Sequence, residues 1–458
     1  MGVEDVFREY DIRGVFNAQL VPETISKIAM AFGTYLEGSG EVIIGRDSRV
    51  GSEIIEGILS YSLASIGCDA TSVGMVPISV ANYAMWKNKP KAGAVITASH
   101  NPPEYNGLRF RHSDGTGYTA ENKIIRDIFF SGRFLKREWN QIGKVLSIPS
   151  RVTLTDYSGY LLDRVKTDRK LKVVLDPGNG AASVVAPQLF RDLGFEVVTI
   201  NDQPDGTFPG RDPDPSAEGK EALRDLSKLI VRTKADLGVA FDGDGDRAVF
   251  VDEKGRIAIP EKIGIIFAKE YLSKKKGRIV ANVSCSMVLE DELSKVGGQV
   301  IRVRVGDVFI TEAIKAHKAL FGMEISSHFY FPDFYPFDDG VLASIKMAEI
   351  LSHSNEQLSE QLDGIESYPS LRENIECPDN VKFNVIERIK NKYMKEGYRI
   401  DLTDGIRVVL DDGWVLVRPS NTEPKIRITV EGRTKEISEM LLSKFKTDVM
   451  DVEKEYGC

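Results

Sequence analysis

Three segments of the chain repeat one pattern of apolar and polar positions. Each has a short apolar run, a turn of small residues, an amphipathic stretch that stops at glycine, and a second apolar run. The segments begin with EVIIGRDSR, LKVVLDPGNGAAS and RIVANVSCS, and they end with CDATSVG, FEVVTIN and QVIRVRVGD. Each one predicts a strand, a helix of about ten to fifteen residues and another strand. The repetition therefore predicts three related α/β domains with mixed sheets.

The pattern changes in the last part of the chain. Short alternating runs, GIRVVL, WVLVRP and KIRITVEG, surround Asp411-Asp412-Gly413, which is a hairpin signal. The stretch KEISEMLLSKFKTDVMDVEKEYG then predicts one terminal helix. This part is expected to be a smaller α+β domain. Polar or proline-bearing stretches place the four domains at residues 1–150, 151–255, 256–368 and 369–458.

Composition narrows the class of protein. The 458 residues are 42% hydrophobic and 28% charged, which is typical of a globular protein with several cores. A net charge of -8 argues against nucleic-acid binding through bulk charge. The four cysteines form no CxxC pair, so neither zinc nor disulfides are expected. Since the sequence has neither a signal peptide nor an apolar run of membrane-spanning length, we expect a cytoplasmic protein without a membrane partner.

The stretch TASHNPPEYNG places Ser99 beside His100 directly after the apolar run AGAVI. Asn-Pro-Pro ends any regular element there. The serine either ties down the turn or carries chemistry, and the stretch alone leaves both open. A second small-residue stretch, DPGNGAAS, resembles a dinucleotide loop, but Ser183 stands where a third glycine is required. A tight turn from strand to helix is the better interpretation.

The stretch LGVAFDGDGDRAVFVDE carries Asp242, Asp244 and Asp246 at alternate positions, with glycines between them. Three carboxylates on one short loop repel each other unless a cation is present, and oxygen ligands at this density suit Mg²⁺. A plain hairpin tip is one alternative. A calcium-binding EF-hand loop is another, but Arg247 occupies its glycine position and the flanks are typical of strands.

Four further stretches contain groups suited to phosphates or sugars. In LVRPSNTEPKIRI, a guanidinium, hydroxyls and free backbone N–H groups would suit a phosphate; the alternative is a polar turn. In FREYDIRG and GRDSR, basic pairs would bind an anion or be solvated. In FGMEISSHFYF, alternating polar groups would bind sugar hydroxyls or form the polar face of a strand. The residues concerned are Arg418, Ser420, Asn421, Thr422, Arg8, Tyr10, Arg13, Arg46, Arg49, Glu324, Ser326 and His328.

Together these stretches resemble the α-D-phosphohexomutase superfamily, in its order and across almost the whole chain. TASHNPPEYNG is similar to its phosphoserine loop, DGDGDR to its metal loop, MEISSH to its sugar-binding loop and RPSNTEP to its phosphate-binding loop. FREYDIRG, PDGTFPGRDPDPSAEG and FPDFYPFDDG reinforce the match. The resemblance implies four domains around a central cleft and a mutase of small-molecule hexose phosphates. It leaves open a monomer or a homodimer.

The resemblance also implies a role for each matching residue. Ser99 would carry a phosphoryl group, and a hexose 1,6-bisphosphate of glucose or mannose would be the intermediate and activator. One Mg²⁺ per subunit would be held by Ser99, Asp242, Asp244 and Asp246. The implied catalytic residues are Ser99, His100, Arg13, Arg109 and Arg247. The implied sugar-binding residues are Glu324, Ser326, His328, Gly306 and Asp307. The implied phosphate-binding residues are Arg418, Ser420, Asn421, Thr422, Arg427 and Tyr10.

The sequence departs from the family's usual motifs at three places. Arg109 stands where a lysine is common, and arginine is a poor base, so His100 or a carboxylate would handle the proton. Met323 and Ser327 replace glycines in the sugar loop, where they would narrow the pocket. Asn421 replaces a glycine in the phosphate loop, which is a mild change because asparagine tolerates positive φ.

The stretch MEISSHFYFPDFYPFDDG most resembles the phosphomannomutase/phosphoglucomutase group. The expected reaction is therefore the interconversion of mannose or glucose 1-phosphate and 6-phosphate, and a phosphoglucosamine mutase is the nearest alternative. Two alternatives belong to other classes. A phosphohydrolase would use Asp242 as nucleophile and release phosphate without Ser99. A non-catalytic sugar-phosphate binding protein would bind without turnover.

Overall fold

A computed structural model describes residues 2–8, 10–215, 221–420 and 424–456 of the chain. The chain divides into two compact units, Met1–Ile263 with Ser326–Leu362, and Gly264–Ile325 with Asp363–Cys458. Within the described residues, no helix has both the length and the apolarity needed to cross a membrane.

The first unit begins with a six-stranded mixed sheet in the order β1-β5-β4-β2-β3-β6. β2 runs parallel to β3 and β4, whereas β5 runs antiparallel to both β4 and β1. The strands are β1 (Ile12–Val15), β2 (Glu41–Arg46), β3 (Asp69–Met75), β4 (Ala92–Ile96), β5 (Tyr105–Arg111) and β6 (Val145–Ser147). Because β4 and β5 are antiparallel neighbours, the loop between them, residues 97–104, lies at the sheet edge where β4 ends.

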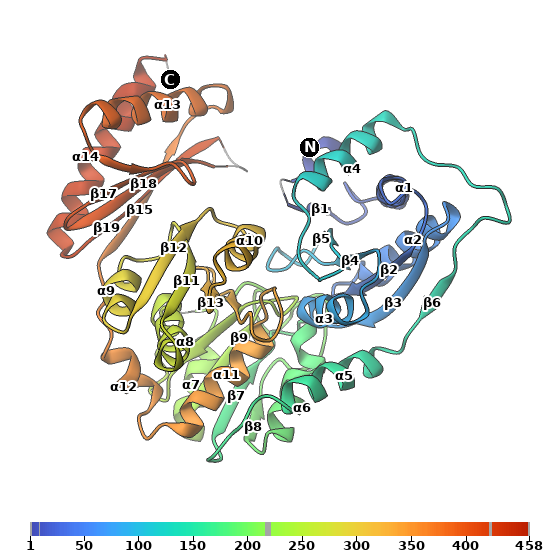
Figure 1. Ribbon diagram of the computed structural model, residues 1–458, viewed down its shortest axis with the longest axis horizontal. Helices are drawn as coiled ribbons and strands as arrows, with labels where there is room; N and C mark the ends of the chain where they lie inside the picture. The colour runs from blue at the N-terminus through green and yellow to red at the C-terminus, as the bar shows by residue number, and fades with distance from the viewer. Residues whose placement is uncertain (1, 9, 216–220, 421–423, 457–458) are drawn as a thin grey trace. The chain divides into compact units, whose positions relative to one another are not determined.

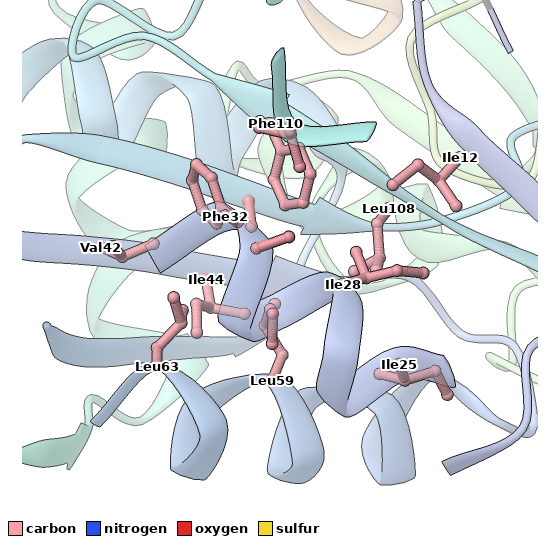
Figure 2. Packing of buried hydrophobic residues seen from close by; sticks show 14 of the residues in the cluster. Ile12, Ile25, Ile28, Phe32, Val42, Ile44, Leu59, Leu63, Leu108 and Phe110 are labelled. Atoms are coloured by element: carbon pink, nitrogen blue, oxygen red, sulfur yellow. The ribbon is translucent and has the colours of Figure 1, made fainter. Parts of the chain in front are cut away.

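The core of this sheet is formed with helix α1. Its apolar side chains recur at helical spacing, so Ile25, Ile28 and Phe32 lie on one face and are fully buried. Phe32 stacks on Phe110 of β5, with ring centroids 3.9 Å apart (Figure 2). The helical segments here are η1 (Val3–Val6), α1 (Pro22–Tyr35), α2 (Ser52–Ser65), α3 (Ile78–Asn88) and α4 (Ala120–Ser131).

The first unit contains a second, four-stranded sheet in the order β10-β9-β7-β8. β9 is parallel to β7, and β10 returns antiparallel to β9, which leaves residues 242–247 at the tip of a hairpin. The strands are β7 (Lys172–Asp176), β8 (Glu196–Thr199), β9 (Leu237–Phe241) and β10 (Ala248–Val251). The helical segments are α5 (Ser150–Leu162), η2 (Ala181–Val184), α6 (Ala186–Asp192) and α7 (Arg224–Thr233). Strands on both sides of the aspartates exclude an EF-hand, which needs helices there.

Two further parts of the chain also combine strands with helices. Residues 326–362 of the first unit supply a short strand and helix α11, whose N-cap Asp339 accepts a hydrogen bond from the Leu342 N–H at 3.0 Å. In the second unit β11 pairs in parallel with β12 and β13. The elements are α8 (Pro260–Lys274), β11 (Gly277–Asn282), α9 (Val288–Ser294), β12 (Gly298–Val303), α10 (Asp307–His317), β13 (Phe321–Met323), β14 (Phe329–Tyr330), α11 (Gly340–His353) and α12 (Leu358–Asp363).

The three predicted strand–helix–strand segments all form parallel strand pairs, β2 with β3, β7 with β8 and β11 with β12. The predicted helix length holds for α2, with 14 residues, but α6 and α9 have only 7 residues each. After β7 the small residues of GNGAAS form turns and the separate 3₁₀ helix η2, and Pro187 lies in the first turn of α6. These residues shorten the helix that periodicity alone predicts.

The C-terminal part of the second unit is a five-stranded antiparallel sheet in the order β15-β19-β18-β17-β16, with α13 and α14 packed against it (Figure 1). The predicted hairpin joins β17 to β18, and Leu410 pairs with Gly413 across it. Pattern reading missed β15, β16 and α13. The elements are β15 (Ser370–Glu376), α13 (Asp379–Lys395), β16 (Arg399–Asp401), β17 (Ile406–Leu410), β18 (Gly413–Pro419), β19 (Lys425–Gly432) and α14 (Lys435–Lys454).

Candidate active site

Ser99 lies in the loop of residues 97–104, here called the serine loop, with a left-handed backbone at a φ of 49°. This conformation costs a non-glycine residue roughly 1–2 kcal/mol of conformational free energy. Contacts from neighbouring residues must therefore stabilise the Ser99 backbone. The Thr97 hydroxyl accepts a hydrogen bond from the Ser99 N–H at 2.8 Å. A Cβ added at Gly243 would lie 2.5 Å from the Ser99 carbonyl oxygen, so only glycine fits there. Ser99 is therefore a buried, positioned side chain, with 2% of its surface exposed.

The Arg49 side chain holds the serine loop in place by binding backbone carbonyl groups of the loop and of the residue that follows it. Its two terminal nitrogens donate to four carbonyl oxygens, those of Ser99, Asn101, Pro102 and Tyr105, at 2.5–2.9 Å. The Arg49 side chain is fully buried. It is therefore neither a solvated surface group nor an open anion ligand, which were the two alternatives the sequence left. Its planar fork of donors explains why arginine rather than lysine stands here.

Arg49→Lys tests whether this support matters for catalysis. The lysine keeps the positive charge but cannot reach four carbonyl groups at once, so Ser99 should lose its fixed position. We expect kcat to fall by about 100-fold, because small misplacements of reacting groups have effects of this size. Steady-state kinetics and circular dichroism would measure the change and the retained fold. Arg46→Lys is the matched control, since Arg46 instead donates to Glu56 at 2.9 Å, and its kcat should change little.

Three aspartates of residues 242–247, here called the aspartate loop, converge on one buried point. One carboxylate oxygen each of Asp242, Asp244 and Asp246 lies within 4.8 Å of the other two. The Ser99 hydroxyl donates to Asp242 Oδ2 at 3.0 Å, and the Thr97 hydroxyl donates to Asp244 Oδ2 at 2.9 Å. The serine loop and the aspartate loop, which are distant in the sequence, thus form one site.

The three carboxylates are in different electrostatic states. Although burial raises the pKa of Asp246, His328, Arg109 and Arg247 outweigh it and hold that pKa well below its usual range, so Asp246 is charged. Burial raises the pKa of Asp242 well above its usual range, and Asp246 and Asp244 raise it further. Burial, followed by the charge of Asp246, raises the pKa of Asp244 to about 6. Asp244 Oδ1 is buried without a hydrogen-bond partner among the described residues. A hard divalent cation would satisfy this oxygen and neutralise the cluster, so the residues fit Mg²⁺.

Magnesium should therefore stabilise the folded protein. A cation that binds the native cluster alone contributes RT ln(1 + [L]/Kd), which is about 2.7 kcal/mol at a concentration of 100 Kd. We expect calorimetry to show a higher melting temperature with MgCl₂ and no such rise after chelation. KCl at equal ionic strength is the control for screening. Equal shifts with both salts would contradict a specific site.

Two arginines bring positive charge to the aspartate loop. Arg247 Nη1 lies 3.6 Å from Asp214 Oδ1, and its Nε lies 3.8 Å from Asp242 Oδ2. Arg109, at the position where the family commonly has lysine, pairs with Asp246 Oδ2 through Nη1 at 3.3 Å. Both guanidiniums are close enough to stabilise an anion at this site, and neither is suited to accept a proton.

The N-terminal candidates have different surroundings. Arg13, in β1, donates to the Asn101 side chain at 2.6 Å and to the Ala98 carbonyl at 3.2 Å, so it supports the serine loop from a third strand. Tyr10 is half-buried in the turn before β1, and its phosphate-binding role stays a prediction.

His100 lies directly against the serine hydroxyl, with Nδ1 3.1 Å from Ser99 Oγ. Burial lowers the pKa of His100 to about 2, and the charges of Arg247 and Arg13 add to this effect. The imidazole is therefore neutral beside Ser99, and the burial and charges that keep it neutral also make it a weak proton acceptor.

His328 is in the opposite electrostatic state. Its Nε2 lies 3.2 Å from Asp246 Oδ1 and 3.7 Å from Asp338 Oδ2, and its Nδ1 lies 2.8 Å from Ser326 Oγ. Although burial lowers the pKa of His328, Asp246 outweighs it and raises the value to about 9. The structure thus places His328 and Ser326 beside the aspartate loop and gives His328 a charged form.

The remaining sugar-binding candidates lie in the second unit. Glu324 Oε1 accepts hydrogen bonds from the Gly306 N–H at 3.0 Å and from Asn282 Nδ2 at 3.1 Å. Gly306 has a φ of 138°, which glycine readily adopts, and Asp307 begins α10. The structure therefore brings Glu324 and the 306–307 turn together.

The phosphate-binding candidates also lie in the second unit. Arg418 and Arg427 are paired residues of β18 and β19. Burial lowers the pKa of Arg418, and the Arg427 charge adds to that effect. Arg418 Nη1 also lies 3.4 Å from Asp404 Oδ2, and the neighbouring guanidiniums of Arg418 and Arg427 together would suit an anionic ligand. Ser420 is buried at the end of β18, whereas Asn421 and Thr422 lie outside the described residues.

Sequence reasoning missed two acidic residues of the site, Asp214 and Asp338. Both lie in stretches that the sequence singled out, PDGTFPGRDPDPSAEG and FPDFYPFDDG. A signal was therefore present, but nothing local in either stretch indicates that Asp214 meets Arg247 or that Asp338 meets His328.

Models of one protein family match nearly the whole chain. The family is described as phosphoglucomutase/phosphomannomutase. Its α/β/α domains I, II and III match residues 4–136, 155–255 and 260–368, and its C-terminal domain matches residues 373–446.

Individual proteins match over a similar length. A probable phosphoglucosamine mutase of Methanothermobacter thermautotrophicus is 40% identical over 436 residues, which is 94% of each chain. A phosphoglucomutase/phosphomannomutase of Thermococcus kodakarensis is 37% identical over 94% of this chain and 95% of its own. The crystal structure of a phosphoglucomutase/phosphomannomutase family protein from Burkholderia thailandensis superposes with a TM-score of 0.89 at 28% identity, covering 99% of this chain and 98% of that one.

Proposed function

The chain belongs to the phosphoglucomutase/phosphomannomutase family of hexose-phosphate mutases, and from this premise we propose that Ser99 carries the phosphoryl group it transfers. The observation that carries the proposal is the position of Ser99 Oγ, held 3.0 Å from Asp242 Oδ2 and 3.1 Å from His100 Nδ1. A serine that only tied down a turn would not need a left-handed backbone, a contact from its carbonyl to the buried Arg49 and a carboxylate cluster beside it.

The reaction proceeds in two balanced transfers. Phosphorylated Ser99 gives its phosphoryl group to O6 of a hexose 1-phosphate. O6 loses its hydroxyl proton, Ser99 Oγ gains one, and the product is a hexose 1,6-bisphosphate. The bisphosphate then reorients within the site, so that its other phosphoryl group faces Ser99. Ser99 Oγ then loses its proton and takes the phosphoryl group from O1, which gains a proton, and the hexose 6-phosphate leaves. The enzyme ends phosphorylated, as it began, so no net phosphate is consumed.

The chain's own residues divide this work. Asp242, Asp244 and Asp246, with an oxygen of phosphorylated Ser99, would hold Mg²⁺, which supplies positive charge to the transferring group. Arg247 stabilises the developing charge on the same group.

Arg109 pairs with Asp246 and stays protonated. It therefore supplies positive charge to the site and does not act as a base. His100 Nδ1 lies within hydrogen-bond distance of Ser99 Oγ and helps to orient it, but a pKa of about 2 makes His100 a weak base. A carboxylate of the site would therefore take up and return the Ser99 proton, and Asp242 already accepts the hydrogen bond of the Ser99 hydroxyl at 3.0 Å. Glu324, Ser326 and His328 bind sugar hydroxyls, and Arg418 with Ser420 binds the phosphate that does not react.

Glucose and mannose phosphates are the proposed substrates. These sugars differ only at C2, so a pocket that binds O3 and O4 accepts both. Glucosamine phosphate is the second candidate, and the names of curated relatives favour it, including the one 40% identical to this chain. The relative named phosphoglucomutase/phosphomannomutase, 37% identical, favours the first candidate.

Phosphorus NMR tests the proposal and ranks the sugars. The purified protein with Mg²⁺ and a trace of glucose 1,6-bisphosphate is given the 1-phosphate of glucose, mannose or glucosamine in separate reactions. Appearance of the 6-phosphate supports the mutase, and the fastest sugar identifies the substrate. Release of free phosphate without any 6-phosphate would instead indicate a phosphohydrolase. Binding of the sugar phosphates without turnover would indicate a binding protein.

A further inference from the structure

A cavity of about 400 Å³ lies inside the second unit, between α9 and β12 on one side and β16, β17 and β18 on the other. This volume is within the range of small-molecule sites. None of the residues proposed to bind the sugar or the phosphate lines it. The cavity is therefore separate from the groups that the proposed function uses.

Arg407 is the residue that makes this cavity unusual. It lines the cavity, 7% of its surface is exposed, and its Nε has no hydrogen-bond partner among the described residues. Its guanidinium lies over the Trp414 ring, 4.7 Å from the ring centre. This cation–π contact and the charges of Glu290, Asp401 and Glu431 offset only part of the cost of burying Arg407, because a buried arginine normally has hydrogen-bonded anionic partners.

Two other arginines of the cavity already have such partners. Arg302 pairs with both oxygens of Glu290, at 2.8 and 2.6 Å, and also donates to three backbone carbonyls. Arg433 pairs with Asp291 at 3.0 Å. These pairs fix the walls. The proximity of Arg302 adds a second positive charge near Arg407 and, after burial, helps to lower the Arg407 pKa to about 10.

The remaining charged residues of the lining define the ligand. Arg399 is an exposed cation at the cavity, and Asp401 and Asp411 are carboxylates able to accept hydrogen bonds. Asp401 Oδ1 already accepts from the Thr403 N–H at 2.8 Å. A simple dianion would meet repulsion from these carboxylates. An oxyanion with hydroxyl groups would bind Arg407 with its charged end and donate to Asp401 and Asp411 with its hydroxyls.

We propose that this cavity is a binding site for a small hydroxylated oxyanion, such as a phosphorylated polyol, with Arg407 as its principal contact. The site is independent of the proposed phosphoryl transfer at Ser99. Trp414 also joins the two walls, since its Nε1 donates to Glu431 Oε2 at 2.7 Å and the same oxygen accepts from the Met287 N–H at 2.8 Å. A bound anion would therefore add contacts across this junction.

Trp414 provides a local reporter for the test. Of the three tryptophans, Trp86 and Trp139 are replaced by phenylalanine in the full-length chain, which leaves the ring beneath Arg407. Its fluorescence is titrated with glycerol 3-phosphate, inorganic phosphate and glycerol. We expect saturable binding of glycerol 3-phosphate, weaker binding of phosphate and none of glycerol. No saturable change with any probe up to about 10 mM would overturn the proposal.

Variants separate a binding role from a structural one. Arg407→Met should weaken glycerol 3-phosphate binding at least about tenfold, and Arg407→Lys should weaken it less, because it keeps the charge. Arg407→Met should keep or raise the melting temperature, since it removes a buried cation whose Nε has no hydrogen-bond partner among the described residues. Arg164→Met is the matched control, because Arg164 also lies over an aromatic ring, that of Tyr160. Equal binding by Arg407→Met and the parent would refute the site.

Discussion

Ser99→Ala is expected to abolish the interconversion of hexose 1- and 6-phosphates, with a loss of kcat on the order of 10⁴-fold or more. The substitution removes the only atom that the proposed mechanism uses to store the phosphoryl group. The His100 and Asp242 partners of that atom would remain but would have nothing to act on. Phosphorus NMR would measure turnover, and mass spectrometry of the intact protein would show loss of the covalently bound phosphate.

Two further variants make this result specific. Ser26→Ala removes a hydroxyl that pairs with Ser62 at 3.0 Å and should leave turnover unchanged. Ser99→Gly should be as inactive as Ser99→Ala but about 1 kcal/mol more stable than it, because glycine adopts the left-handed φ of 49° without strain. Turnover that survives in Ser99→Ala would show that another residue carries the phosphoryl group.

The general fold and the two loops that meet in the site could be predicted because their signals are local. Aspartates at alternate positions between two predicted strands indicate a carboxylate cluster, wherever in the fold that segment lies. The structure shows both the hairpin and the cluster. The family resemblance is likewise confirmed by all four family models. The predicted bounds of the four domains stay predictions.

The partners of the site residues could not be predicted, because they depend on distant contacts. Arg49 lies in a basic stretch that is equally typical of a surface or an anion site, and only the folded sheet brings it under the serine loop. His328 is ambiguous in sequence for the same reason. Its charge depends on Asp246, which follows β9 in another sheet. The predicted helix lengths were wrong where small residues and a proline form turns, because the spacing of apolar residues gives no sign of such turns.

Asp244→Asn is expected to lower kcat by about 100-fold or more while making the magnesium-free protein more stable. The side chain keeps its size, and its amide oxygen can still accept the Thr97 hydroxyl that now donates to Oδ2 at 2.9 Å. The amide nitrogen replaces Oδ1, the buried oxygen that has no partner among the described residues. The substitution therefore removes a negative charge that burial and the neighbouring charge of Asp246 destabilise in the parent protein.

These opposite effects distinguish a metal ligand from a structural acid. Because the variant loses a ligand, MgCl₂ should raise its melting temperature much less than that of the parent. Asp252→Asn is the matched control, since Asp252 is equally buried but accepts from Arg256 Nε at 2.6 Å and from two backbone N–H groups. That variant should lose stability and keep the full magnesium response. If Asp244→Asn behaved as Asp252→Asn does, the aspartate loop would be a structural turn, and Ser99 would need another source of positive charge.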